Sequence, residues 1–162
     1  MESRVVRTYD VSDMLQLRYT EVHPRVLVRG VWARIGIELG TLVEECPVVP
    51  IYADEPHTGL NMIRSYAYGW KVRDDNGNLI VSHALSMGMG GIYNHAQPGN
   101  ITNVMHRDEF RMEFFALRDI DAGEELTHNY GWGRAPGARL NPVDRFLRPI
   151  PRSRFRSLGI DE

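Results

Sequence analysis

Two short polar clusters in the middle of the chain carry residue types that could hold a ligand and act on it. The first is Asn94-His95, which follows the glycine-rich run at residues 88–91. The second spans residues 121–132 and contains the pair Tyr130-Gly131. An Asn side chain both donates and accepts hydrogen bonds, His does either on its ring nitrogens, and Tyr offers a hydroxyl. Because apolar strand-like segments lie between the clusters, we interpret them as parts of one site rather than as core.

The same residues also have other interpretations. Tyr130 can be a buried strand tyrosine, Asn94-His95 a hydrogen-bonded turn, and Trp132 an ordinary core residue. Met87 and Met89 are better explained by packing than by ligand contact. A metal-dependent β-barrel enzyme could use His95 and His128, although no carboxylate stands at a clear ligand spacing.

The segments that must position these residues have the pattern of short β-strands. Alternating residues predict strands at 5–9, 15–19 and 26–35, and Asn76-Gly77 between β-rich runs predicts a hairpin. A second hairpin is expected over 101–117, turning at 106–109. Residues 41–45 and 48–51 predict a strand pair broken at Pro47, and Gly30 predicts a bulge or a close approach of backbone. No amphipathic helix longer than about two turns is evident, so a mainly β domain is expected.

Composition narrows the class of protein. A chain of 162 residues with 43% hydrophobic and 25% charged residues fits one globular domain. Its net charge of -2 argues against a protein that coats nucleic acid. No apolar run reaches the roughly 20 residues that span a bilayer, and the N-terminus lacks a signal-peptide core. Cys46 is the only cysteine, which excludes an internal disulfide and a cysteine-rich zinc site and makes a cytoplasmic location the default.

Four blocks, in order, resemble the SET-domain family of S-adenosylmethionine-dependent protein lysine methyltransferases. They are Arg29-Gly30-Val31-Trp32-Ala33, Ser65-Tyr66-Ala67-Tyr68, Asn94-His95-Ala96-Gln97-Pro98-Gly99-Asn100 and Gly123-Glu124-Glu125-Leu126-Thr127-His128-Asn129-Tyr130-Gly131. The resemblance covers residues 26–132, leaving lead-in strands at 1–25 and an arginine-rich C-terminal flap at 133–162. The compact form is most similar to minimal viral and bacterial members. It implies a β-clip fold of several small curved sheets with few short helices.

The resemblance also implies roles for individual residues. Tyr130 and Tyr66 are the expected catalytic residues, and Tyr68 and His128 are expected to line the substrate channel. The residues expected to bind S-adenosylmethionine, which leaves as S-adenosylhomocysteine, are Gly30, Val31, Trp32, Asn94, His95 and Trp132. No metal is needed, because the sulfonium carries its own leaving group. Four positions depart from the family pattern: Val28 stands at a usual glycine, Ala96 at a common serine, Pro98 one place early, and His128 where members carry Phe or Tyr. The last departure leaves the number of methyl groups open.

Methyl transfer to lysine requires a neutral amine in line with the sulfonium methyl group. Free lysine has a pKa near 10.4, so a narrow, dry, aromatic channel must favour the uncharged amine by desolvation. We expect the Tyr130 hydroxyl to orient that amine.

The expected partner is a protein or peptide lysine, with histones as one candidate substrate. Seven arginines in residues 133–162 form either a solvated terminus or a lid over the peptide that contacts an acidic surface or nucleic acid. An edge strand could pair two copies into a homodimer. If the chain is exported as an effector, the expected location is the nucleus of a host cell instead of the cytoplasm. Lys71 is the only lysine, which reflects either a GC-rich genome or an enzyme that spares itself. The rival function is a catalytically silent β-clip module that binds a peptide.

Overall fold

The computed structural model describes residues 4–23, 26–54 and 66–130. Its elements are ten strands and two 3-10 turns: β1 (Arg4–Asp10), β2 (Leu15–His23), β3 (Val26–Ala33), β4 (Leu42–Tyr52), β5 (Ala67–Arg73), β6 (Leu79–Ser86), η1 (Met89–Gly91), β7 (Asn94–His95), β8 (Ile101–His106), η2 (Arg107–Glu109), β9 (Arg111–Ala116) and β10 (Glu125–His128). The expected mainly β fold with few short helices is confirmed. Trp132 and the proposed flap at 133–162 lie outside the described residues.

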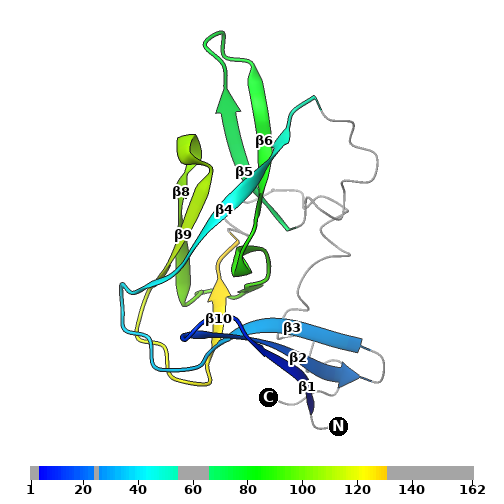
Figure 1. Cartoon of the computed structure of the whole chain (residues 1–162), viewed down its shortest axis with the longest axis vertical. Helices are drawn as coiled ribbons and strands as arrows, with labels where there is room; N and C mark the ends of the chain where they lie inside the picture. The colour runs from blue at the N-terminus through cyan, green and yellow to red at the C-terminus, as the bar shows by residue number, and fades with distance from the viewer. Residues whose placement is uncertain (1–3, 24–25, 55–65, 131–162) are drawn as a thin grey trace.

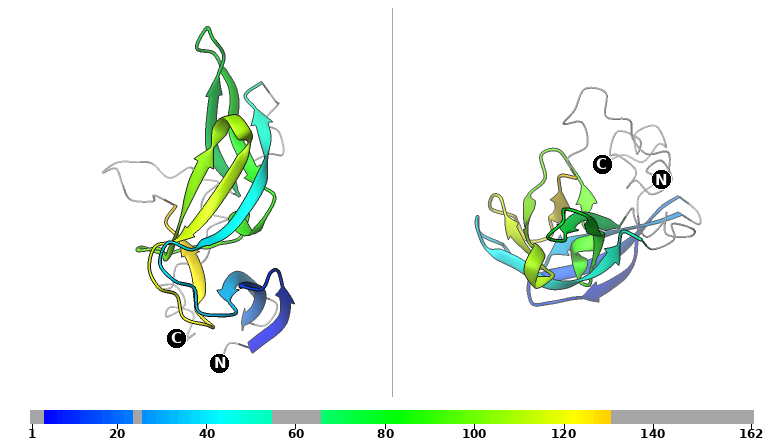
Figure 2. Two further views of the ribbon diagram at one scale, coloured as in Figure 1. Left: turned by 60° about the vertical axis from the view of Figure 1, so that its left-hand side comes forward. Right: turned by 90° about the horizontal axis from the view of Figure 1, so that it is seen from above.

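The strands follow one another in the order β1-β2-β3-β10-β8-β9-β4-β6-β5, and β7 pairs with β10. The sheet is not closed into a barrel. Strands β1 to β3 form a curved layer at one end of the molecule, and β4, β5, β6, β8 and β9 form a long blade at the other (Figures 1 and 2). The short strand β10 lies between these two parts. The candidate site residues on and beside β10 therefore lie at the junction of the two layers.

Both predicted hairpins are present, and so are the two N-terminal strands. Strands β5 and β6 pair antiparallel around a turn in which Gly77 has a φ of 83°. Asp74 Oδ1 accepts hydrogen bonds from the backbone N–H of Asn76 and Asn78 in that turn. Strands β8 and β9 pair from Ile101↔Ala116 to His106↔Arg111, with η2 as their connection. Alternation and turn chemistry were sufficient here because both act over a few residues.

The predicted break at Pro47 is wrong, because β4 runs through it as one strand of 11 residues. The first part of β4 pairs with β9 as far as Pro47, and the part from Val48 onward pairs with β6. Pro47 lies where the strand changes partners, and its carbonyl accepts a hydrogen bond from Met87 N over 3.0 Å. A residue without an N–H fits this position, because the ladder bond there uses the Pro47 carbonyl.

Gly30 interrupts no strand, so a bulge at this position is also wrong. It pairs with Arg18 in the regular register between β2 and β3. The predicted close approach is present, but to side chains. A Cβ at Gly30 would overlap Glu125 Oε1 and lie 3.1 Å from Asn94 Nδ2.

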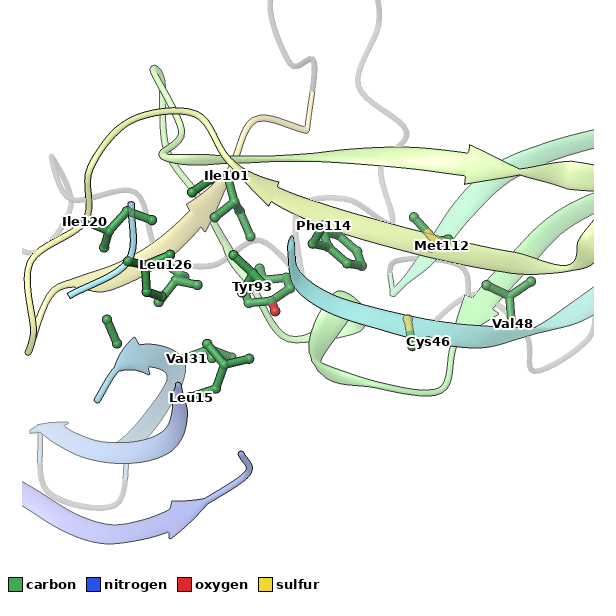
Figure 3. Close-up of a cluster of buried hydrophobic side chains, with 14 of the residues drawn as sticks. Leu15, Val31, Cys46, Val48, Tyr93, Ile101, Met112, Phe114, Ile120 and Leu126 are labelled. Carbon is green, nitrogen blue, oxygen red and sulfur yellow. The ribbon is translucent and has the colours of Figure 1, made fainter. Parts of the chain in front are cut away.

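The hydrophobic core passes through the junction and joins the two layers. Tyr93 lies between Leu126 on one side and Phe114 on the other (Figure 3). All three are fully buried, as are Val31, Ile101 and Met112. The rings of Tyr93 and Phe114 have centroids 5.1 Å apart. Since burial of a large apolar side chain contributes about 1.5–3 kcal/mol, this packing fixes where β10 lies.

Candidate active site

Strand β10 brings together the two polar clusters found in the sequence. It pairs parallel with β7 through Thr127↔Asn94 and His128↔His95, and antiparallel with β3 through Glu125↔Trp32. It also meets β8 in parallel at Ile101. Three segments far apart in the chain, around residues 30, 94 and 127, therefore share one junction.

The turn at residues 96–100 holds β10 in this position. Asn100 is buried, and its Nδ2 donates to Glu125 O over 2.8 Å while its Oδ1 accepts from Thr127 N over 2.7 Å. Its backbone N–H donates to Thr127 O over 2.9 Å. A Cβ at Gly99 would lie 2.7 Å from Thr127 O, so only glycine allows the turn to lie this close to the strand.

Tyr130 lies two residues after the end of β10 and contacts the first cluster. Its backbone N–H donates to His95 Nδ1 over 3.0 Å, and its hydroxyl donates to the Tyr93 carbonyl. The rings of His95 and Tyr130 have centroids 5.2 Å apart. Burial raises the pKa of Tyr130 to about 12, so the phenol stays protonated at neutral pH. Burial lowers the pKa of His95, which keeps its ring neutral and lets Nδ1 accept.

The two expected channel residues lie against Tyr130 in one aromatic cluster. The His128 ring is 5.9 Å from the Tyr130 ring and 6.2 Å from the Tyr68 ring. Tyr68 donates its hydroxyl to Gly90 O over 2.6 Å, and burial raises its pKa. His128 is 8% exposed, and its buried Nδ1 has no hydrogen-bond partner among the residues that the structure describes. Burial, and then the nearby His95, lower the pKa of His128 to about 4, so it is neutral at pH 7.

A second group of polar side chains lies at the other edge of Tyr130. Asn94 Nδ2 donates to Arg29 O over 2.8 Å and to Glu125 Oε1 over 2.7 Å. Within the described part of the chain, Asn94 Oδ1 accepts no hydrogen bond. The Arg29 guanidinium lies 5.1 Å from the centre of the Tyr66 ring. The charges of Arg29 and Glu125 both act on the pKa of Tyr130, which places them in the same neighbourhood.

The structure also shows how the predicted residues of β3 are arranged. The Val31 side chain is fully buried in the core. Val31 and Trp32 pair with β2 on one side and with β10 on the other, whereas Gly30 pairs with β2 alone. The Arg18 guanidinium stacks over Trp32, with its Cζ 4.8 Å from the centre of the Trp32 ring. The middle of β3, at Arg29 and Gly30, is the part that faces Asn94, and the binding roles of Val31 and Trp32 stay predictions.

Sequence reasoning missed several residues that build the site, namely Arg29, Glu44, Tyr93, Asn100 and Glu125. Glu44 contacts the segment before Asn94 through two hydrogen bonds. A register shift between Leu42 and Glu44 turns it inward, which a strict alternation of two cannot predict. Glu125 and Asn100 did stand inside the blocks that carry the resemblance, so their position was a usable sign.

The SET-domain profile matches residues 28–131, which is more than half of the chain. The chain belongs to the SET-domain family. It is 27% identical over 123 residues to a Schizosaccharomyces pombe protein named "Histone-lysine N-methyltransferase, H3 lysine-37 specific", covering 75% of this chain and 76% of that protein.

Two solved structures are also similar to this SET-domain chain. A Plasmodium falciparum protein provisionally named a histone methyltransferase matches with a TM-score of 0.55 and 21% identity, over 76% of this chain and 97% of that one. This match supports the fold. A humanized mutant of the Chaetomium thermophilum Polycomb Repressive Complex 2, bound to the inhibitor GSK126, matches with a TM-score of 0.45 and 27% identity, over 72% of this chain and 14% of that chain.

The described residues also bear on metal-binding and membrane-spanning classes of protein. No group of three or more His, Cys, Asp and Glu side chains in residues 4–23, 26–54 and 66–130 is arranged to hold a metal ion. No helix in the same residues is long and apolar enough to cross a bilayer. His95 and His128 do lie close together, and both rings pack against Tyr130.

Proposed function

We propose that this SET-domain chain is a protein lysine N-methyltransferase that transfers a methyl group from S-adenosylmethionine to a lysine ε-amine, with histones among its substrates. The observation that carries the proposal is the junction of β10 with β7. It places the hydroxyl-bearing cluster of Tyr68 and Tyr130 beside the polar group of Asn94 and Glu125. The name of the fission yeast relative supports the same reaction class.

The polar group fits the amino-acid end of the cofactor. That end carries an ammonium and a carboxylate, and the cofactor as a whole supplies an activated methyl group on a sulfonium. Asn94 Oδ1 is an acceptor without a partner in the described residues, and Glu125 adds negative charge beside it. Arg29 provides a guanidinium nearby, which suits a carboxylate. Gly30 has no side chain to fill the space, so Asn94 and Glu125 can approach the backbone of β3.

The aromatic cluster fits the lysine amine. The hydroxyls of Tyr68 and Tyr130 each donate to a backbone carbonyl, Gly90 O and Tyr93 O. A phenol oxygen that donates its hydrogen can also accept an N–H bond, and an amine that donates to it has its own lone pair oriented. His128 is neutral at pH 7 because burial lowers its pKa to about 4, so it adds no positive charge to repel the amine. Burial of the amine among these rings favours its uncharged form.

A radiolabelled methyl-transfer assay on histones and on cell lysate tests the proposal. The wild type should label a protein band, and Tyr130→Phe should lower turnover by about a hundredfold while cofactor affinity changes little. Tyr52→Phe, at a tyrosine that is 46% exposed on β4, is the matched control and should keep full activity. Lys71→Arg separates transfer to the added protein from transfer to the chain's own lysine.

Calorimetry with S-adenosylmethionine separates this enzyme from a silent peptide-binding module. Binding of the cofactor by the wild type is expected. Absence of binding, together with absence of labelling, would favour the module and end the proposal.

A further inference from the structure

Glu44 is a half-buried carboxylate on β4 that holds the segment leading into Asn94. Its Oε1 accepts a hydrogen bond from Met89 N over 2.6 Å, and its Oε2 accepts one from the Tyr93 hydroxyl over 2.9 Å. Met89 begins the η1 turn, and Tyr93 comes directly before Asn94. One carboxylate therefore fixes both ends of a five-residue segment.

The same segment supplies the acceptors for both phenols of the candidate site. The Tyr68 hydroxyl donates to Gly90 O over 2.6 Å, and the Tyr130 hydroxyl donates to Tyr93 O. Tyr68 lies on β5 and Tyr130 lies just after β10, and these two strands do not pair with each other. Their relative position depends on where the carbonyls of Gly90 and Tyr93 lie.

The segment has little freedom to move around Glu44. A Cβ at Gly88 would overlap the Glu44 carboxylate and lie 2.9 Å from Cys46 Cβ. A Cβ at Gly90 would lie 2.7 Å from Phe114 Cζ. The Tyr93 ring is fully buried between the two layers (Figure 3). Its hydroxyl donates to Glu44 Oε2 from this buried position. The Glu44 carboxylate therefore packs closely against the Met89–Tyr93 segment and the residue before it.

Burial of a carboxylate is unfavourable unless hydrogen bonds offset it. Burial raises the pKa of Glu44, while the bonds from Met89 and Tyr93 act in the opposite direction. The other titratable groups that face it are Cys46 on its own strand, Tyr68 on β5, and Tyr93. Among the described residues none of these groups is a cation, so the contacts that the structure gives Glu44 are its two hydrogen bonds.

We propose that Glu44 is a positioning residue for methyl transfer. By holding Met89 and Tyr93, it sets the two carbonyls that fix the hydroxyls of Tyr68 and Tyr130 toward the amine. This inference rests on the proposed function. A residue of this kind should affect the rate of the chemical step more than the binding of the cofactor, because Asn94, Glu125 and Arg29 lie outside the segment that it holds.

The test compares kcat, the KM for S-adenosylmethionine and the cofactor Kd in Glu44→Ala and Glu44→Gln. Glu44→Ala should lower kcat by about tenfold or more with KM and Kd within about twofold of the wild type. Glu44→Gln keeps an oxygen acceptor for Met89 N–H and should recover kcat to within about threefold of the wild type. Glu45→Gln is the matched control on the same strand, at an exposed carboxylate, and should leave kcat unchanged.

Two further measurements separate positioning from loss of fold. Val48→Ala opens the core of the same strand without touching the segment, so it should lower Tm but not kcat. Hydrogen–deuterium exchange of the Met89–Tyr93 amides should speed up in Glu44→Ala and not in Val48→Ala. If Glu44→Ala does not fold, Tyr93→Phe removes the bond to Oε2 alone and should lower kcat by about threefold.

The outcomes distinguish this inference from the proposed function. An active wild type whose kcat is unchanged in Glu44→Ala would overturn the role of Glu44 only. So would equal losses of kcat in Glu44→Ala and Glu44→Gln, or a loss of kcat in Val48→Ala that matches its loss of stability. A wild type that transfers no methyl group removes the proposed function, and the role of Glu44 with it.

Discussion

The backbone N–H of Tyr130 donates to Nδ1 of His95 across 3.0 Å, joining residues 35 positions apart. An N–H can only donate, so His95 Nδ1 must carry a lone pair and the neutral ring must hold its proton on Nε2. Protonation of the ring would put a hydrogen on Nδ1 and break this bond. Burial lowers the pKa of His95 and so protects the bond at neutral pH. The position of Tyr130 is therefore linked to the charge state of His95.

Replacement of His95 tests this link. His95→Ala leaves the Tyr130 N–H without its acceptor and should lower methyl transfer by about tenfold, since the phenol is no longer held in place. His95→Asn offers a carbonyl oxygen at a similar reach and should recover part of that loss. The measurement is kcat for both variants, with Tm as the check on folding. Equal activity in His95→Ala and the wild type would contradict the link.

Asn94 should matter for cofactor binding more than for turnover. Asn94→Ala removes the donor to Arg29 O and Glu125 Oε1 and also the acceptor Oδ1. We expect the Kd for S-adenosylmethionine to rise by about tenfold to a hundredfold, equivalent to about 1.4–3 kcal/mol. Isothermal titration calorimetry measures this change. Asn78→Ala, in the exposed turn between β5 and β6, is the control and should keep the wild-type Kd.

Gly30 offers a steric version of the same test. A Cβ there would overlap Glu125 Oε1 and crowd Asn94 Nδ2 at 3.1 Å, so Gly30→Ala should push both side chains away from β3. The Kd for the cofactor should rise as in Asn94→Ala. Gly36→Ala is the matched control, because nothing lies within 4 Å of a Cβ at that position. A wild-type Kd in Gly30→Ala would show that this contact is not part of the binding site.

The local parts of the fold were predictable, and the junction was not. Alternation and the Asn76-Gly77 turn act within one hairpin, so β1, β2, β5, β6, β8 and β9 followed from the sequence. The parallel pairing of β10 with β7 depends on contacts between segments that are more than 30 residues apart, and β7 has only two residues. No period is readable over two residues. The strand break expected at Pro47 is absent, because β4 changes partners there and that position needs no N–H.

The site was predictable where residue type was informative. Asn94, His95 and Tyr130 stood out as polar residues beside glycines, and the structure brings all three together. Tyr93 and Glu44 did not, because a tyrosine in an apolar run and a glutamate in a strand are both ordinary. Tyr93 contacts Tyr130 through its backbone carbonyl, and the position of Glu44 depends on a register shift in β4. Neither feature can be predicted from the type of side chain.

Asn100 should be a large contributor to stability. It is 2% exposed and forms three hydrogen bonds with the backbone of β10, through Nδ2, Oδ1 and its own N–H. Asn100→Ala removes both side-chain bonds to the β10 backbone and also the bond from Nδ2 to Glu124 Oε1. A loss of about 2–4 kcal/mol in the free energy of unfolding is expected. Asn103→Ala, at a half-buried position on β8, should cost much less, and denaturant titration compares the two.

His128 should make the stability of the chain depend on pH. Its pKa falls from 6.5 in the unfolded chain to about 4 in the folded one, because burial disfavours the charged ring. Between these values the unfolded chain binds a proton that the folded chain does not. Stability should therefore be full above pH 6.5 and decrease as the pH falls toward 4, by up to about 3 kcal/mol from this group. His95, whose pKa is also lowered, adds a loss of the same sign.

His128→Phe removes this titration and the unpartnered Nδ1 while keeping an aromatic ring beside Tyr68 and Phe114. The variant should be more stable than the wild type by about 1–3 kcal/mol at pH 7, because a buried polar atom without a hydrogen bond is lost. Its advantage should widen at pH 5, since the wild type alone loses stability through His128. Thermal unfolding at both pH values measures the two effects. Parallel pH curves for His128→Phe and the wild type would mean that His128 is accessible to protons in the folded chain.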